Sequence, residues 1–320
     1  GDITVDPKKQ ERIYITGVPL LFSDNGGKTF QSIDGDNVHS DHHVVWINPN
    51  NPNHLVNGND GGLNITYDNG KSWQLCNSIP VGQFYAVNVD EQEPYNIYGG
   101  LQDNGVWVGA SNYSASIGWQ QEGKYPYARL MGGDGMQIQI DKRNPNIVFT
   151  GYQYGSYYRI NRADESKSKF IAPKAKKGDK PYRYNWQSPI LLSSHNQDIL
   201  YLGSNFLHRS MNQGDTWTAI SPDLTQGGKQ GNVAFGTLTT ISESPFEFGV
   251  LYTGSDDGLV QFSNNGGANW KVISTTLPQN LWVSRVVASA HKKERVYVTL
   301  NGYRNDDFTS YVYVSEDAGQ

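Results

Sequence analysis

SDNGGKTF at residues 23–30 returns, with small changes, as TYDNGKSW (66–73), SMNQGDTW (210–217), SNNGGANW (263–270) and the incomplete SEDAGQ (315–320). A phrase that returns along one chain is an internal repeat, and it decides the fold. Its third slot holds Asp or Asn, which can bond the backbone two residues on and close a turn. Its fifth slot holds Gly, which accepts a positive φ, and its eighth slot holds an aromatic residue for packing between units. The phrase therefore predicts tight turns between antiparallel strands.

Seven hairpin patterns accompany these phrases, near residues 12–23, 54–66, 96–108, 147–160, 199–210, 250–263 and 296–315. Measured from Gly17, Gly58, Gly100, Gly151, Gly203, Gly254 and Asn301, the repeats are separated by 41, 42, 51, 52, 51 and 47 residues. Periods of roughly 40 to 50 residues with several short strands are typical of β-propeller blades. The chain is therefore predicted to be all-β and to form a single seven-bladed β-propeller over residues 1–320.

The third and fourth units have no recognisable phrase and carry insertions instead, at 110–131 and 162–186. At its two ends the chain begins with Gly1, inside the first unit, and stops at Gln320, inside the fifth phrase. The sequence is therefore expected to be one part of a longer polypeptide, whose remainder is a possible partner of this propeller.

Composition narrows the classes of partner. The net charge of −5 and the isoelectric point near 5.8 give no basic surface for nucleic acid. Cys76, the single cysteine, excludes an intrachain disulfide and a cysteine-based zinc site. No apolar run approaches the roughly 18 residues that cross a bilayer, so no membrane insertion is expected. No cofactor is predicted either.

In a propeller, the turns between second and third strands open on the same face as the connections between blades. The residues that this rule places there are mostly carboxylates, amides and aromatics: Asn59, Asp60, Gln102, Asp103, Gln153, Tyr154, Asn205, Asp256 and Asp257 from the turns, and residues 39–43 (with His39, Asp41 and His43), residues 83–85 (with Tyr85), Asp134, Trp186 and Trp282 from the loops before the inner strands. Gln153, Asn205, Trp282 and the unnamed residues of the two ranges are not among the candidate site residues. Such a mixture suits a polysaccharide cleft or an extended peptide. The alternative is that each Asp or Asn is only a turn former.

Two clusters in this set have further interpretations. On an extended strand, His39, Asp41 and His43 project to one side and could converge on a metal. Hydrogen bonding at the mouth of a central channel is preferred, and no metal is predicted. Asp60 and Asp134 are the candidate catalytic carboxylates. A pair about 6.5 to 9.5 Å apart would suit inverting glycoside hydrolysis, and a pair about 5 to 5.5 Å apart would suit retention.

With these motifs the chain resembles bacterial Asp-box (BNR) repeat β-propeller proteins related to sortilin-type receptors and to xyloglucan-hydrolysing glycosidases. The resemblance is carried by the phrases, by HSDHHVVWINPNNPNHLVNGNDGGL (39–63), VGQFYAVNVDEQEPYNIYGGLQDNG (81–105), GGDG (132–135) and YRYNWQSPILLSSHN (182–196). It implies a Gly-Asp-x-Gly-Gly turn with a catalytic Asp, but here Asn59 fills that slot and Asp60 follows it. In the glycosidases the second carboxylate comes from a separate propeller.

The resulting expectation is a secreted or cell-surface propeller that binds glycan and, when complete, hydrolyses polysaccharide with two carboxylates. The alternative is a sortilin-like protein-interaction or scaffold module without catalysis. Either function implies an extracellular, cell-surface or periplasmic location.

Overall fold

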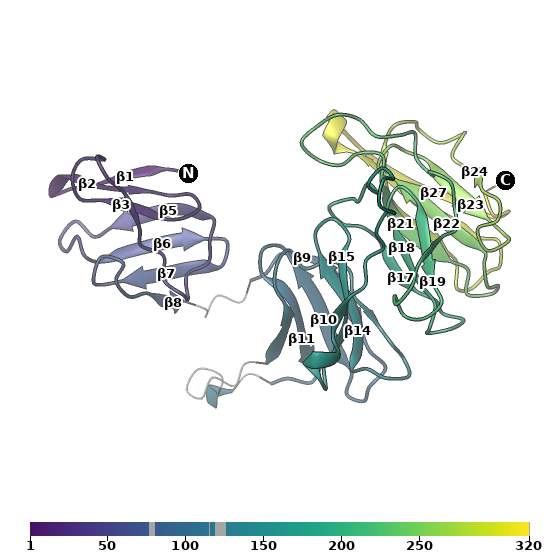
Figure 1. Ribbon diagram of the computed structural model, residues 1–320, viewed down its shortest axis with the longest axis horizontal. Coiled ribbons are helices and arrows are strands. Elements are labelled where there is room, and N and C mark those ends of the chain that lie inside the picture. The colour runs from purple at the N-terminus through teal and green to yellow at the C-terminus, as the bar shows by residue number, and fades with distance from the viewer. Residues whose placement is uncertain (77–80, 115, 119–125, 320) are drawn as a thin grey trace. The chain divides into compact units, whose positions relative to one another are not determined.

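The computed structural model describes residues 1–76, 81–114, 116–118 and 126–319 and divides the chain into two compact units, Gly1–Gln83 and Phe84–Gln320 (Figure 1). Each unit is described by itself. In the described residues, every regular element is a β-strand apart from two short 3₁₀ turns and the helical residues 117 and 118, and the paired strands are antiparallel. The all-β prediction is therefore confirmed.

The first unit contains two four-stranded sheets. Sheet 1 consists of β1 (Ile3–Asp6), β2 (Lys9–Ile15), β3 (Leu21–Ser23) and β4 (Gln31–Ser32), and sheet 2 of β5 (His42–Ile47), β6 (Leu55–Asn59), β7 (Gly62–Thr66) and β8 (Gln74–Cys76). Tyr14 and Phe22 of sheet 1 share one buried core with Val45 and Trp73 of sheet 2. The first unit therefore folds around the apolar faces of two adjacent repeats.

The second unit contains five further sheets. Sheet 3 consists of β9 (Phe84–Val89), β10 (Asn96–Leu101), β11 (Gly105–Ala110) and β12 (Tyr127–Met131), and sheet 4 of β13 (Gln139–Ile140), β14 (Ile147–Tyr152), β15 (Ser156–Asn161) and β16 (Lys169–Phe170). Sheet 5 consists of β17 (Ile190–Leu192), β18 (Leu200–Gly203), β19 (Leu207–Ser210) and β20 (Thr218–Ala219), and sheet 6 of β21 (Leu238–Glu243), β22 (Leu251–Ser255), β23 (Val260–Ser263) and β24 (Lys271–Val272). Sheet 7 consists of β25 (Trp282–Ala288), β26 (Val296–Gly302) and β27 (Asp307–Ser315). The 3₁₀ turns are η1 (Glu165–Lys167) and η2 (Tyr303–Asn305).

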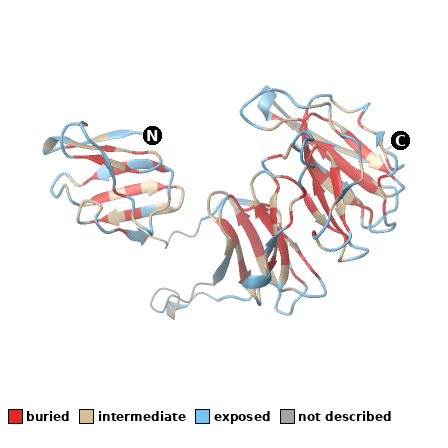
Figure 2. Ribbon diagram, viewed as in Figure 1, coloured by how far each residue is buried: buried red, intermediate tan, exposed pale blue. Residues whose placement is uncertain are grey.

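Sheets 4 to 7 pack through their first strands, β13 against β17, β17 against β21 and β21 against β25, and β11 of sheet 3 contacts β14 of sheet 4. Four buried apolar clusters fill the spaces between neighbouring sheets, and Figure 2 shows the buried residues concentrated on the strands. Seven antiparallel sheets of three or four strands are the sheet content of a seven-bladed propeller.

The meander order gives each sheet two distinct ends. We call the end with the connection between the third and fourth strands the phrase end, because four of the repeated phrases occupy it. The other end, with the turn between the second and third strands and the connection to the next sheet, is the linker end. The two ends present different sets of side chains, and the predicted site residues belong to the linker end.

The phrase turns repeat one hydrogen-bond pattern. The hydroxyl of the first slot accepts from the N–H of the fifth-slot glycine, at 2.9 Å for Ser23 and Gly27 and 2.8 Å for Ser210 and Gly214. The fifth-slot glycines have φ values between 82° and 93°, which confirms the predicted positive φ. The third-slot side chain, however, accepts from the N–H four residues on, as in Thr29 to Asn25 at 3.0 Å. The sequence analysis was wrong to place this bond two residues on, because the hydroxyl of the first slot faces that part of the turn.

Four of the phrase turns also pack against the preceding sheet, just after the fourth strand of that sheet. An isoleucine just after that outer strand lies against the fifth-slot glycine, so that a Cβ on Gly214 would stand 2.8 Å from the Ile171 side chain. In the three complete turns of this set, the eighth-slot indole donates to the carbonyl of this isoleucine: Trp73 to Ile33 at 2.8 Å, Trp270 to Ile220 at 3.0 Å, and Trp217 to Ile171. The equivalent isoleucines are Ile33, Ile171, Ile220 and Ile273. The glycine therefore serves close approach as well as turn geometry.

The two insertions contribute strands to their own sheets. β12 lies within 110–131, and η1 and β16 lie within 162–186. Residues 115 and 119–125 of the first insertion are outside the described residues. In sheets 3 and 4, the insertion therefore takes the place of the phrase turn that precedes the fourth strand in other sheets.

Across the part of the chain that the structure describes, no helix combines the length and the apolar composition needed to cross a bilayer.

Candidate functional site

Asp134 is the centre of the best-connected group of predicted residues. It lies in the connection from β12 to β13, at the linker end, and is only 7% exposed. Its Oδ1 accepts from the backbone N–H of Asp103 at 2.9 Å, and its Oδ2 accepts from the side chain of Gln153 at 2.5 Å. The backbone N–H of Asp134 donates to Gln153 Oε1 at 3.3 Å. One carboxylate therefore holds the hairpin turns of sheets 3 and 4 together.

Glycines allow this connection to pass close to the neighbouring turn. A Cβ on Gly135 would stand 2.3 Å from the carbonyl oxygen of Gly105, which no side chain tolerates. Gln102 and Asp103 occupy the same turn, half-buried, and Asp103 has a φ of 60°. The glycines of the GGDG segment (132–135), which the sequence analysis quoted, thus allow the close backbone approach that the Asp134 contacts require.

Three aromatic residues from three consecutive sheets contact one another, and one of them, Tyr85, lies within reach of the Asp134 charge. The indole N–H of Trp186 donates to the hydroxyl of Tyr85 at 3.3 Å. The rings of Trp186 and Tyr154 meet edge to face, with centroids 5.2 Å apart and an interplanar angle of 84°. The backbone N–H of Tyr154 donates to the carbonyl of Trp186 at 3.2 Å. Tyr154 and Trp186 are each 39% exposed, so their rings offer surface to a ligand.

The electrostatics of the group act on the Tyr85 hydroxyl. Burial raises the pKa of Tyr85, and the charges of Asp134 and Asp103 raise it further, while the hydrogen bond from Trp186 lowers it. The hydroxyl is therefore held in its neutral form at physiological pH. It can act as a hydrogen-bond donor next to the two carboxylates.

The predicted ligand residues of sheet 6 are used internally instead. Asp256 is 4% exposed and accepts from the backbone N–H groups of Gly236 and Thr237, at 3.0 and 2.9 Å, and from the Thr237 hydroxyl at 2.6 Å. Burial is the largest influence on Asp256 and raises its pKa. Asp257 accepts from the backbone N–H of Gln226 at 2.6 Å. Both aspartates anchor the loop that connects sheets 5 and 6, so their carboxylates bind the backbone of a neighbouring loop and not only that of their own turn.

The histidine segment of the first unit departs from the predicted geometry. Asp41 has a φ of 62°, and a bulge interrupts the pairing of β5 between His42 and Val44. The sequence analysis was wrong to treat residues 39 to 43 as one extended strand, because these two features break the alternation that would align His39, Asp41 and His43. In the described ranges there is no group of three or more His, Cys, Asp or Glu side chains that could hold a metal ion.

The histidines make hydrogen-bonded pairs. His43 Nε2 lies 2.6 Å from Asp60 Oδ1, and its side chain is 68% exposed. The neighbouring His42 is buried between Asn57, at 2.9 Å, and Asp34, at 3.0 Å. Hydrogen bonding is the use that the sequence analysis preferred for this segment.

Other predicted residues near β5 serve the local backbone. His39 Nδ1 lies 2.8 Å from the carbonyl of Ser40, and the Ser40 hydroxyl donates to Asp41 at 3.1 Å. Asn59 is 9% exposed and its amide donates to Asn57 and Asn64 at 2.8 and 2.9 Å. The predicted catalytic pair is divided between the two units, because Asp60 belongs to the first and Asp134 to the second.

Gln153, Phe84 and Trp282 also occupy the linker-end positions that the sequence identified, but they are outside the predicted ligand-binding set. Gln153 completes the contacts of Asp134. Phe84 precedes Tyr85 and is 53% exposed. Trp282 begins an inner strand, as Trp186 precedes one, but its ring is covered by the guanidinium of Arg304, 4.0 Å from the ring centroid. Trp186 therefore differs from Trp282 in having an available ring.

No protein-family model matches the chain, and no curated protein matches it. Among solved structures, the Niastella koreensis GH74 enzyme is 13% identical with a TM-score of 0.33, covering 99% of this chain and 64% of its own. YCF48 from Cyanidioschyzon merolae is 13% identical with a TM-score of 0.44, covering 93% and 91%. Chaetomium thermophilum Raptor is 12% identical with a TM-score of 0.45, covering 98% and 28%. The chain thus spans 64% of the GH74 enzyme, and function has to be argued from the residues of this chain.

Proposed function

We propose that the chain is a glycan-binding β-propeller of the Asp-box kind, with its site at the linker end of sheets 3, 4 and 5. The observation that carries the proposal is the contact of Trp186 with both Tyr85 and Tyr154 beside Asp134. Sugars combine apolar ring faces with hydroxyls in fixed directions, so an open aromatic surface next to carboxylates and amides is complementary to them. An extracellular, cell-surface or periplasmic location is part of this proposal.

Within this site, the exposed rings of Trp186 and Tyr154 stack on sugar faces, and Tyr85, Gln102 and Asp103 bind hydroxyls. Asp134 positions the site through its contacts with Asp103 and Gln153. A general acid needs a free oxygen that can reach the leaving group, whereas both oxygens of this buried carboxylate already accept hydrogen bonds. The proposal therefore favours binding over hydrolysis, and catalysis by Asp60 and Asp134 stays a prediction from the sequence.

The test is a glycan array followed by calorimetry on the whole chain, with Trp186→Ala and a matched control, Trp282→Ala. Trp282 is also a linker-end tryptophan, but its ring is covered by Arg304. We expect Trp186→Ala to weaken binding about 10-fold, which corresponds to about 1.4 kcal/mol, within the range for stacking plus lost contact area. Trp282→Ala should keep the wild-type affinity.

Two results would overturn the proposal. One is that the wild-type chain binds no plant or bacterial polysaccharide on the array. The other is that the chain binds members of a peptide library but no glycan, and that this binding is lost in Trp186→Ala. That result would favour the protein-interaction alternative. Release of reducing ends from a bound glycan, lost in Asp134→Asn at unchanged affinity, would restore the hydrolase prediction.

A further inference from the structure

Two neighbouring sheet interfaces at the phrase end use equivalent arginines. At the interface of sheets 4 and 5, Arg159 of β15 donates to the carbonyl of Gln213, the fourth slot of a phrase turn, at 3.2 Å. At the interface of sheets 5 and 6, Arg209 of β19 donates to the carbonyl of Gly266, also a fourth slot, at 3.2 Å. The two guanidinium groups therefore dock on the following phrase turn in the same way.

The surroundings of the two arginines differ in charge. Arg159 lies 3.0 Å from the carboxylate of Asp215, the sixth slot of its phrase, and Lys169 also pairs with Asp215. The hydrogen bond from Lys169 is the largest influence on Asp215 and lowers its pKa.

At the second interface, Ala268 takes the sixth slot, and Thr218 pairs with Arg209 in register where Lys169 pairs with Arg159. Throughout the described ranges, Arg209 forms no ion pair with an Asp or Glu side chain. Arg209 is linked to an acid indirectly, because its side chain is hydrogen-bonded to Tyr201, whose hydroxyl donates to Glu243 at 2.9 Å.

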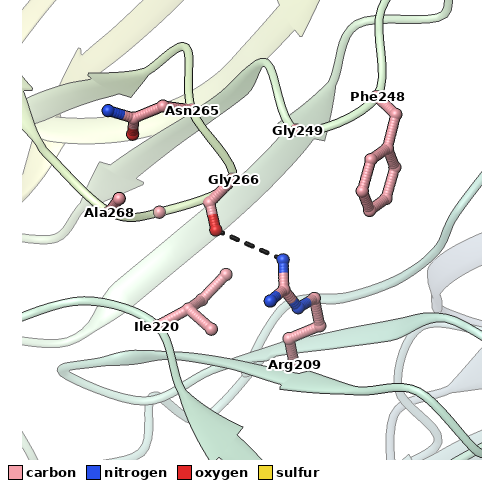
Figure 3. Close-up of a pocket in the computed structure, with 8 residues that line it drawn as sticks. Arg209, Ile220, Phe248, Gly249, Asn265, Gly266 and Ala268 are labelled. Atoms are coloured by element: carbon pink, nitrogen blue, oxygen red, sulfur yellow. Dashed lines mark hydrogen bonds between the residues drawn. The ribbon is translucent and has the colours of Figure 1, made fainter.

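A cavity of about 570 Å³ opens beside this arginine, lined by Arg209, Ile220, Phe248, Gly249 and the turn residues Asn265, Gly266, Gly267 and Ala268. Figure 3 shows the guanidinium reaching up to the Gly266 carbonyl, with the Phe248 ring on one side and Ile220 on the other. Phe248 is 46% exposed, and the glycines at 249, 266 and 267 leave the wall without side chains. The cavity therefore combines one positive charge with apolar walls.

We propose that this cavity binds a carboxylate that carries an apolar, preferably aromatic, group. The ligand carboxylate takes the place next to Arg209 that Asp215 holds next to Arg159, and a guanidinium binds a carboxylate through paired N–H donors. The apolar group lies against Phe248 and Ile220. Such a ligand is either a free aromatic acid or the carboxyl-terminal residue of a peptide. This site is at the phrase end, so it does not depend on the glycan site.

Calorimetry on the whole chain tests the proposal with four probes: phenylacetate, a hexapeptide ending in Phe with a free carboxylate, the same peptide as its amide, and inorganic phosphate. We expect phenylacetate or the free-acid peptide to bind at least about 10-fold more tightly than the amide peptide and phosphate, because only the first two supply both a carboxylate and an aromatic group. Comparing phenylacetate with the free-acid peptide identifies the source.

Three variants assign the binding to this cavity. Ala268→Asp installs an internal carboxylate, as at Asp215, and should weaken the favoured probe about 10-fold or more while leaving the fold intact. Arg209→Gln should do the same, whereas Arg159→Gln, at the interface whose carboxylate is already present, should bind like wild type. The proposal is overturned if the wild type binds none of the probes at millimolar concentration, if phosphate binds as tightly as phenylacetate, or if Ala268→Asp binds unchanged.

Discussion

At the phrase end of the sheets, serine or threonine in the first slot and glycine in the fifth make the same hydrogen bond in every copy of the turn. At the linker end, the aspartates make contacts that do not repeat from one unit to the next. Asp134 joins two hairpin turns beside an open aromatic surface, while Asp256 is enclosed by the loop that it anchors. A repeated set of contacts indicates a structural requirement shared by all units. Contacts that differ between units leave room for a ligand, so function is to be sought where the repeats diverge.

The largest expected effect on stability comes from a substitution in a phrase turn. Gly214→Val would place a branched side chain at a φ of 88° and at 2.8 Å from Ile171. The left-handed backbone and the clash together should lower the free energy of unfolding by about 3 kcal/mol or more. Chemical denaturation measures this loss.

The matched control is Gly26→Asn. Gly26 also has a positive φ, 69°, but an added Cβ meets nothing within 4 Å, and Asn69 already fills the equivalent fourth slot in the second phrase. Its midpoint should remain near that of the wild type. Equal midpoints for Gly214→Val and the wild type would contradict the docking role of the fifth-slot glycine.

The second effect concerns a buried histidine that supports the linker end of sheet 5. His208 is 1% exposed, and its Nε2 lies 2.8 Å from the hydroxyl of Ser204. Burial lowers the pKa of His208 from 6.5 to about 4. The unfolded chain then binds a proton more readily than the folded chain. The stability contributed by the neutral histidine is therefore complete above pH 6.5 and is lost as the pH falls toward 4.

The size of this loss should be about 3 kcal/mol across that range, since each pKa unit corresponds to 1.36 kcal/mol. Urea denaturation at a series of pH values measures it. His208→Gln should flatten the dependence on pH, whereas His291→Gln, at an exposed position, should keep the wild-type dependence. An unchanged slope in His208→Gln would show that another group controls the acid sensitivity.

The sequence was most informative about the repeated end. The phrase contains its own partners within eight residues, so the turns, the glycine conformations and the all-β class followed from local chemistry. The period of the hairpins indicated seven sheets, which the structure contains. The sequence predicted only that the aromatic residues of the phrase pack between units. It did not identify Ile33 as the partner of Trp73, because that partner lies 40 residues away.

The sequence predicted which side chains lie at the linker end, but not what each of them contacts. Topology placed Asp134, Tyr154 and Trp186 at one end, and the structure brings them together with Tyr85. The same rule selected Asp256 and Asp257, which anchor a loop, because spacing does not show whether a carboxylate already has enough donors. The left-handed backbone at Asp41 was not visible either, since nothing in the sequence around it requires a positive φ.

The smallest expected effect concerns a position at which the phrase turns differ from one another, the sixth slot. Asp215 pairs with Arg159 and Lys169, and its side chain is 41% exposed, so solvent screens much of the interaction. Asp215→Ala should lower the free energy of unfolding by about 0.5 to 1 kcal/mol, and Ala268→Asp should raise it by a similar amount beside Arg209. Both changes should shrink in 1 M sodium chloride, where the screening length is about 3 Å. Urea denaturation at low and high salt measures them. If Ala268→Asp destabilises the chain at low salt while Asp215→Ala behaves as expected, the two arginines are not in equivalent surroundings, and the electrostatic comparison between the two interfaces is wrong.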